Sequence, residues 1–344
     1  MTEDQQTTAV QTSTGVDDVQ LLAQCSQACS RLRTEVGKVV VGQEQVVDSM
    51  LIALLAGGHA LLVGVPGLAK TLLVSSMARA LDLSFGRVQF TPDLLPADIT
   101  GTDVLQEHQG TSGMERQLRF MPGPIFKNLV LADEINRTPP KTQAALLQAM
   151  QERKVTVGTQ THTLPPPFQV FATRNPIEQE GTYPLPEAQL DRFLLEIQVG
   201  YPSAQEELEI ARMGTQAGPA ELRSVVTANE VQRYAELVPR MPIVEDALAL
   251  AVAITRNSRP SESMAPASVK KYVRFGAGPR GSQSLVLAAK ARAAMRGEAA
   301  ADVQDVRAIA IPAMRHRLVL SYRAEAEGIG AEAILEDILT ATGR

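Results

Sequence analysis

The sequence predicts an α/β protein in which a parallel sheet domain precedes a smaller helical domain. Up to about residue 200, short apolar runs alternate with helical patterns, which is typical of a parallel sheet with helices on its faces. After Tyr201-Pro202 the strand runs cease and helical patterns follow one another. A chain of 344 residues can bury two cores. We therefore expect a disordered tail at 1–18, a sheet domain at 19–200 and a helical domain at 201–344.

The sheet domain contains five apolar runs that we interpret as strands. They lie at 60–63, 87–90, 129–132, 168–171 and 193–197, and helical periodicity occupies 43–56, 70–81, 140–153 and 186–192. Two polar segments interrupt this alternation, at 103–120 and 154–164, and each turns at a glycine. Their alternating pattern predicts two hairpins outside the sheet.

The helical domain begins with the spacing of a capping box, Ser203 with Glu206, and a second box pairs Thr227 with Glu230. Helices are expected near 203–216, 227–239, 243–257, 281–297, 301–320 and 331–341. No strand run of comparable strength occurs there, so we expect this domain to be all-α.

Composition narrows the function classes. A formal net charge of -5 and 4% aromatic residues provide neither a global basic field nor a stacking surface, so nucleic acid is not an expected partner. The start of the chain lacks the apolar core of a signal peptide, and the longest apolar region, 50–65, is too short to span a bilayer. A cytoplasmic protein without membrane insertion is the expectation. Cys25 and Cys29 are interpreted as reduced thiols, and the scattered histidines predict no protein-bound metal site.

One segment has the pattern of a phosphate-binding loop. Residues 64–71 follow an apolar strand, open a helix and read Gly64-Val65-Pro66-Gly67-Leu68-Ala69-Lys70-Thr71. Such a loop aims backbone N–H groups at phosphate oxygens. Lys70 can reach the β and γ phosphates, and the Thr71 hydroxyl can ligate magnesium. The usual pattern has glycine where Ala69 stands, and a chance glycine-rich turn is the alternative. The order of strand, loop, Lys-Thr and helix favours a nucleotide site that extends to Leu72.

Two carboxylates, Asp133 and Glu134, end the third strand. Phosphoryl transfer needs one carboxylate for the metal's hydration shell and another to activate water, roles that suit Asp133 and Glu134 respectively. Alone, such a pair is more often a solvated helix start; together with the upstream loop it predicts a catalytic site. Asn175 ends the next strand, where it either forms an Asn-Pro turn or positions the attacking water. The residue pattern does not decide between these two roles.

These motifs resemble the MoxR family of AAA+ ATPases. The resemblance runs from Val41-Gly42-Gln43 to the end of the sheet and is densest at 64–71, 132–143 and 175–193, with shorter matches at 90–96 and 98–101. The family carries alanine at the position of Ala69. The helical domain matches more loosely, at Pro279-Arg280 and around 315–317.

The resemblance implies a P-loop AAA+ parallel sheet domain followed by a small all-α lid. It assigns the two expected hairpins to a helix-2 insert and a pre-sensor-1 hairpin. It implies ATP and Mg²⁺ as cofactors and homo-oligomeric rings of about six subunits with ATP between them. Residues 41–43 would line the adenine pocket, and Asn175 would be the sensor-1 residue. Arg192 would be an arginine finger reaching a neighbour's γ phosphate, and Arg280 would be sensor 2, brought by the lid.

The chain departs from the family pattern at two positions. Arg174 stands where the family usually has glutamine, which adds a positive charge beside Asn175, and Gly278 replaces the usual serine before Pro279-Arg280. The sequence leaves two roles for Arg137: a contact to a neighbouring subunit or a local ion pair.

Four functions compete for this chain. The first is a ring ATPase that remodels client proteins, with a von Willebrand factor A domain partner that the resemblance alone implies. The second is a DNA-translocating motor, which the charge of -5 does not favour. The third is a nucleotide-gated scaffold, against which Glu134, Asn175 and Arg192 argue. The fourth is chelatase-like metal insertion. The sequence does not name the client, the partner or the ring size.

Overall fold

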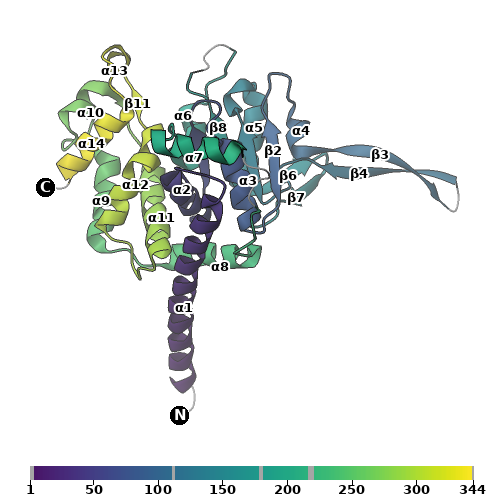
Figure 1. The fold of residues 1–344 in the computed structure, drawn as a ribbon, viewed down its shortest axis with the longest axis horizontal. Coiled ribbons are helices and arrows are strands. Elements are labelled where there is room, and N and C mark those ends of the chain that lie inside the picture. The colour runs from purple at the N-terminus through teal and green to yellow at the C-terminus, as the bar shows by residue number, and fades with distance from the viewer. Residues whose placement is uncertain (1–3, 111–112, 178–180, 216–220, 343–344) are drawn as a thin grey trace.

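The structure is a computed structural model that describes residues 4–110, 113–177, 181–215 and 221–342. Its centre is a parallel five-stranded sheet in the order β2-β5-β8-β1-β9 (Figure 1). The strands are β1 (His59–Val63), β2 (Phe85–Gln89), β5 (Leu129–Asp133), β8 (Gln169–Arg174) and β9 (Phe193–Gln198). All five coincide with the apolar runs of the sequence, so the predicted sheet is confirmed.

Helices cover both faces of the sheet, and two apolar cores result. The helices of this domain are α2 (Glu44–Leu55), α3 (Lys70–Ala80), α5 (Pro140–Glu152) and the short α6 (Glu187–Leu190). Every residue of β1 and β5 is buried, as expected for parallel strands that are covered on both sides. Ala60 and Leu62 of β1 belong to one core, while Leu61 and Val63 belong to the other.

The two predicted hairpins are present outside the sheet. After the short helix α4 (Pro96–Thr100), strands β3 (Gly101–Gly110) and β4 (Gly113–Pro122) pair antiparallel and extend away from the body (Figure 1). The shorter hairpin consists of β6 (Lys154–Val157) and β7 (Gln160–Thr163). The ring of His162 stacks on Phe120 with centroids 3.8 Å apart and planes 10° apart, so the two hairpins are in contact.

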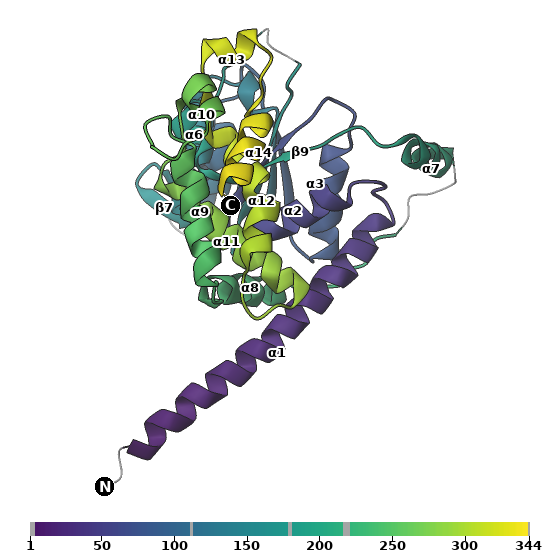
Figure 2. The same cartoon turned by 90° about the vertical axis from the view of Figure 1, so that its left-hand side faces the viewer.

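The amino-terminal segment differs from its prediction. Helix α1 runs Asp4–Gly37, so the described part of the expected disordered tail, residues 4–18, is helical (Figure 2), and residues 1–3 lie outside the described residues. Among residues 17–37 of α1, whose side chains the structure describes, burial begins at Leu21, and Cys25 and Cys29 lie in the same apolar stripe as free thiols. A hydrogen bond with Cys29 and burial both raise the pKa of Cys25.

The second domain is helical, as predicted, with one addition. Its helices are α7 (Ala204–Thr215), α8 (Ala228–Leu237), α9 (Glu245–Asn257), α10 (Ala267–Tyr272), α11 (Pro279–Arg296), α12 (Val303–Met314), α13 (Tyr322–Ala326) and α14 (Ala331–Thr342). Strands β10 (Val273–Phe275) and β11 (Val319–Leu320) form a small antiparallel ribbon that the sequence does not reveal. Consequently the helix expected at 301–320 ends at Met314, followed by a 3₁₀ turn at 315–317. Among the described residues, no helix has the length and apolarity needed to cross a bilayer.

His59 is a buried histidine at the amino end of β1. Its Nδ1 accepts a hydrogen bond from the Val170 N–H at 3.0 Å, and its Nε2 lies 3.1 Å from the Met150 carbonyl oxygen. The ring is therefore neutral, with the proton on Nε2. Burial lowers the pKa of His59 to about 4.

We predict that the free energy of unfolding falls when the pH drops below about 6.5. The unfolded state takes up a proton on His59 at that pH, whereas the folded state does so only near the lowered pKa of about 4. Stability from this group is therefore complete above about 6.5 and declines by at most ~1.4 kcal/mol per pH unit between the two values. Urea titrations from pH 7.5 to 5 measure this slope. The variant His59→Gln should show a smaller slope, and equal slopes would contradict the assignment.

Candidate functional site

The carboxyl ends of three central strands bring most of the predicted site residues together. Strands β1, β5 and β8 are neighbours, and Val63 lies beside Arg174 in the register. Gly64 therefore follows β1 next to the end of β8, where its N–H donates to the Arg174 carbonyl at 3.3 Å. Asp133 ends β5 at the same edge. This edge is where open α/β sheets bind ligands.

The phosphate loop has the backbone shape that its role requires. Gly67 and Ala69 adopt positive φ angles of 87° and 53°, and such left-handed residues turn successive N–H groups toward one side of a loop. Ala69 holds this conformation despite its Cβ, at a cost of about 1 kcal/mol. Gly64 cannot be replaced without a shift, because a Cβ there would lie 2.6 Å from the Val199 carbonyl oxygen. The prediction of a loop that cradles phosphate accords with this geometry.

Lys70 opens helix α3 and folds back over the loop. Its Nζ donates to the carbonyl oxygens of Gly64 at 2.6 Å and Val65 at 2.8 Å. Burial lowers the pKa of Lys70, while the nearby carboxylates of Asp133 and Glu134 oppose that shift. The ammonium group thus lies at the edge shared by the loop and the acidic pair. The Thr71 hydroxyl and the Asp133 carboxylate offer the hard oxygen donors that Mg²⁺ prefers, so these residues fit a nucleotide with its magnesium.

The Asp133 carboxylate is held by two side chains that the sequence analysis missed. Its Oδ1 accepts from the Thr173 hydroxyl at 2.7 Å, and its Oδ2 accepts from Arg87 at 2.7 Å. The Thr173 oxygen in turn accepts from the backbone N–H of Glu134 at 2.8 Å. These contacts orient Asp133 from both neighbouring strands. The pairing of β2 and β8 with β5 would have revealed them, but strand order is not readable from one sequence.

Glu134 is held by its own set of contacts. The residue adopts a left-handed backbone with φ of 57°, which is uncommon outside glycine and frequent at functional sites. Its Oε2 accepts from the Gln89 amide at 2.7 Å and forms an ion pair with Arg137 at 3.2 Å. The structure thus gives Arg137 a local ion pair, one of the two roles left open by the sequence. Gln89 is a further residue that sequence reasoning missed.

Asn175 and Arg174 close the site on the β8 side. The carboxamide oxygen of the buried Asn175 accepts from the Ile177 N–H at 3.1 Å, so the side chain forms a local turn, and its water-positioning role stays a prediction. Arg174 pairs with Glu196 of β9 at 3.5 Å. Burial raises the pKa of Glu196, and the Arg174 charge opposes that shift. The extra positive charge of Arg174 is therefore compensated within the chain.

The expected adenine segment 41–43 lies beside the same edge. The Gln43 amide donates to the Gly200 carbonyl at 3.1 Å, and Gly200 follows the Val199 that contacts Gly64. Gly42 has φ of 74°, and a Cβ there would meet the Glu206 carboxyl group at 2.3 Å. Leu72, the last residue of the predicted nucleotide segment, lies on α3 and is 44% exposed. The adenine role of 41–43 stays a prediction.

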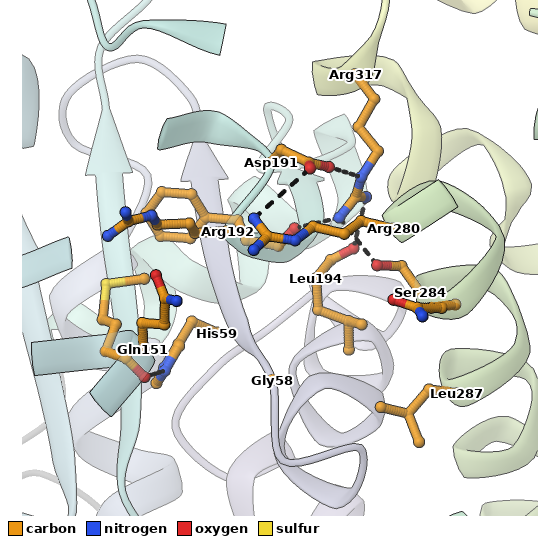
Figure 3. Close-up of a pocket in the computed structure, with 13 residues that line it drawn as sticks. Gly58, His59, Gln151, Asp191, Arg192, Leu194, Arg280, Ser284, Leu287 and Arg317 are labelled. Atoms are coloured by element: carbon orange, nitrogen blue, oxygen red, sulfur yellow. Dashed lines mark hydrogen bonds and ion pairs between the residues drawn. The ribbon is translucent and has the colours of Figure 1, made fainter. Parts of the chain in front are cut away.

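Arg192 and Arg280 lie at the opposite edge of the sheet. Arg192 directly precedes β9, whose first residue Phe193 pairs with His59 at the amino end of β1. The phosphate loop begins after the carboxyl end of β1, and five strand residues span about 16 Å. Arg280, at the start of α11, has its Nη1 3.9 Å from Asp191 Oδ2, so it shares this edge with Arg192 (Figure 3). Neither arginine is placed at its own phosphate loop.

Both arginines line a cavity of about 290 Å³ between the sheet and the lid (Figure 3). Its wall carries three guanidinium groups, those of Arg192, Arg280 and Arg317, against the single carboxylate of Asp191. His59 also lines the cavity and is neutral at pH 7, because burial lowers its pKa to about 4. The cavity therefore carries an excess of positive charge, which suits an anionic group.

The lid places Arg280 through helix α11, whose first residues are Pro279 and Arg280. The N-cap is Gly278, with φ of -79° and ψ of -178°, and it makes no side-chain capping bond. A serine there could cap the helix with its hydroxyl oxygen, which stabilises helix ends by a few tenths of a kcal/mol relative to glycine. The start of α11 thus lacks one of the usual constraints on a helix end.

Comparison with known proteins matches both domains. The family model described as "ATPase family associated with various cellular activities (AAA)" matches residues 59–195, and the AAA lid domain model matches 266–338. Chaperone MoxR1 of Mycobacterium tuberculosis is 44% identical over 306 residues, which cover 89% of this chain and 79% of the relative. Protein MoxR of Paracoccus denitrificans is 35% identical over 303 residues, which cover 82% and 86%. A solved structure from Cytophaga hutchinsonii, provisionally described as an ATPase, has a TM-score of 0.86 at 38% identity and covers 96% and 98% of the two chains.

The Arg174–Glu196 pair generates a stability prediction. Arg174→Gln removes the charge that compensates a buried carboxylate, so the free energy of unfolding should fall by about 1–3 kcal/mol, less than for a fully buried pair because Arg174 is one third exposed. Adding Glu196→Gln removes the uncompensated charge and should restore most of the loss. Chemical denaturation of both variants measures the difference. Additive losses in the double variant would show that the two side chains do not interact.

Proposed function

This chain belongs to the MoxR family of AAA+ ATPases, and we propose that it hydrolyses ATP at sites shared between the subunits of a ring. The separation of the two halves of the site carries this proposal. The phosphate loop and the acidic pair lie at the carboxyl edge of the sheet, whereas Arg192 and Arg280 lie at the amino edge. Since one subunit does not bring both halves to one nucleotide, a neighbour must supply the second half.

Each subunit's own loop would bind the nucleotide. The N–H groups of residues 64–70 and the Lys70 ammonium would hold the phosphates, while Thr71 and Asp133 would hold the magnesium. A bound Mg²⁺ supplies neutralisation of charge on the β and γ phosphates. Glu134 would accept a proton from the attacking water, and Asn175 would position that water. Gln89 donates a hydrogen bond to the Glu134 carboxylate and Arg137 forms an ion pair with it, so these two side chains orient the carboxylate.

The neighbour's amino edge would complete the site. A guanidinium directed at the γ phosphate offsets the charge that develops on the transferred phosphoryl group. Arg192 would serve as this finger, and Arg280 would act beside it on the same nucleotide rather than on its own subunit's. The excess positive charge of the cavity that they line supports this role. A ring of about six subunits is the assembly that we propose.

Remodelling of client proteins is the use of ATP that we propose. The name of the Mycobacterium tuberculosis relative, Chaperone MoxR1, supports this choice. A partner with a von Willebrand factor A domain remains an expectation from the family resemblance. The β3–β4 hairpin, which extends from the body, is a candidate client contact (Figure 1).

The first functional prediction concerns the water-activating carboxylate. Glu134→Gln should retain ATP binding and lower turnover by at least about a hundredfold, because the base for the attacking water is lost. Lys70→Ala should instead weaken ATP binding itself. Phosphate release and titration with a fluorescent ATP analogue separate the two effects. Glu336→Gln, an exposed carboxylate on α14, is the control and should behave as native. Native turnover in Glu134→Gln would remove its assigned role.

The second functional prediction concerns the shared site. Arg192→Ala should bind ATP and lose roughly 10³- to 10⁵-fold in turnover, the range for arginine fingers. When mixed with Lys70→Ala, it should regain activity, because intact loops then face intact fingers at some interfaces. The mixture is assayed after co-assembly has been demonstrated by native mass spectrometry. A co-assembled mixture no more active than either parent would contradict the neighbour's role.

The third functional prediction concerns nucleic acid. Neither single- nor double-stranded DNA should stimulate ATP turnover at moderate salt, since a net charge of -5 provides no extended basic surface. The assay compares turnover with and without DNA over a salt series. A several-fold stimulation that fades with added salt would favour the DNA-translocating motor instead.

A further inference from the structure

We propose that Asp191 is a positioning residue that couples the orientation of the lid to the presentation of Arg192 and Arg280. This inference rests on the proposed function, because it assigns how the amino edge is arranged for a neighbour's nucleotide. The observation behind it is a buried guanidinium, that of Arg317, which joins the lid to the segment that carries Arg192.

Arg317 uses its whole hydrogen-bonding capacity in this junction. Its Nε donates to Asp191 Oδ1 at 2.8 Å, and its Nη2 donates to the Phe193 carbonyl at 2.7 Å and the Ser284 hydroxyl at 2.9 Å. Its Nη1 donates to the Leu194 carbonyl at 3.2 Å and to the Ala313 carbonyl. A guanidinium has five N–H donors, so each donor has an acceptor. The side chain is 2% exposed and cannot exchange these partners for water.

These acceptors belong to three separate elements. Ser284 lies on α11 one turn after Arg280, Ala313 lies near the end of α12, and residues 191–194 flank Arg192 at the start of β9. Fixing Arg317 therefore fixes the start of α11 relative to the finger segment. Since the lid helices and β9 are held at one point, a rotation of the lid at this point would move Arg280 relative to Arg192.

Asp191 supplies the only carboxylate among the described residues that line this cavity. One oxygen accepts from Arg317, and the other lies 3.9 Å from Arg280 Nη1 (Figure 3). The first contact neutralises a buried charge. The second is too long for a hydrogen bond, so it orients the Arg280 guanidinium while its donors stay available to an anion. The side chain of Asp191 is 27% exposed, so it is screened less than a surface carboxylate.

If Asp191 were only structural, replacing it would change stability alone. If Asp191 positions Arg280, replacing it also lowers hydrolysis of the nucleotide bound by the neighbouring subunit. Asp191→Asn keeps an oxygen acceptor for Arg317 and removes the charge that orients Arg280. We expect turnover to fall at least about tenfold while the KM for ATP stays within about twofold, because the variant's own phosphate loop is intact. Glu332→Gln is the matched control. Glu332 forms a 2.6 Å ion pair with Arg315, which lies in the same 3₁₀ turn as Arg317, but Glu332 itself lies outside the cavity. It should keep native turnover.

Mixing experiments decide between the two roles. Asp191→Asn mixed with Lys70→Ala should regain activity, because the neighbour's intact amino edge then serves the intact loop of the Asp191→Asn subunit. Native turnover in Asp191→Asn, or a co-assembled mixture without recovery, would overturn the proposal. Arg192→Ala mixed with Lys70→Ala runs in parallel. If the Arg192→Ala mixture recovers activity and the Asp191→Asn mixture does not, only the positioning role is overturned. If neither mixture recovers, the shared site is contradicted as well.

A second variant covers the case in which the loss of charge beside buried Arg317 prevents folding. Asp191→Glu keeps the counter-charge and displaces the carboxylate by one methylene, so we expect a folded ring with turnover lowered several-fold and recovery with Lys70→Ala. Thermal unfolding confirms that the variant is folded. Native turnover from a folded Asp191→Glu ring, or a loss that mixing does not repair, counts against the proposal.

Discussion

The parallel direction of β1 and its neighbours is the constraint on which the rest of this structure depends. Parallel strands begin at one edge and end at the other, so every loop after a strand gathers at the carboxyl edge. The phosphate loop, the acidic pair and Asn175 follow β1, β5 and β8, which are adjacent in the sheet. Arg192 precedes β9 and so must lie at the other edge. The length of a strand thus divides the predicted catalytic groups between two surfaces.

In the proposed ring, this division would give each subunit two half-sites. The carboxyl edge provides groups that hold a nucleotide, and each of its carboxylates already has partners within the chain. Asp133 is held by Thr173 and Arg87, and Glu134 by Gln89 and Arg137. The amino edge carries an excess of guanidinium groups over carboxylates. The amino edge therefore has positive charge left to offer an anionic group.

The lid is attached to the amino edge by buried polar contacts rather than by apolar packing alone. His316 and Arg317 both reach the carbonyl oxygen of Phe193, at 3.0 Å and 2.7 Å. Burial lowers the pKa of His316 well below its usual value, so its ring is neutral in this contact. Such contacts are directional, whereas apolar contacts tolerate sliding. The junction consequently specifies one lid orientation, and with it the position of Arg280.

Features that depend on local pattern could be predicted from the amino-acid sequence. The alternation of apolar runs with helical periodicity predicted all five sheet strands, and the glycine-broken polar segments predicted both hairpins. Residues 64–71 and Asp133-Glu134 could also be predicted, because each motif is contiguous in the sequence. Its functional groups lie at or directly after the end of a strand, whatever place that strand has in the sheet. The family resemblance extended these predictions to the lid and to Arg192 and Arg280.

Features that depend on strand order and on packing between distant segments could be seen only in the folded chain. The partners Arg87, Gln89 and Thr173 come from strands that flank β5, and the sequence does not state which strands are neighbours. The placement of Arg280 beside Arg192 results from the contacts of Arg317 with three elements. The ribbon of β10 and β11 joins segments too short to show a strand pattern. Helix α1 begins at Asp4, inside a polar segment whose composition did not mark it as helical, and its second half packs against distant helices.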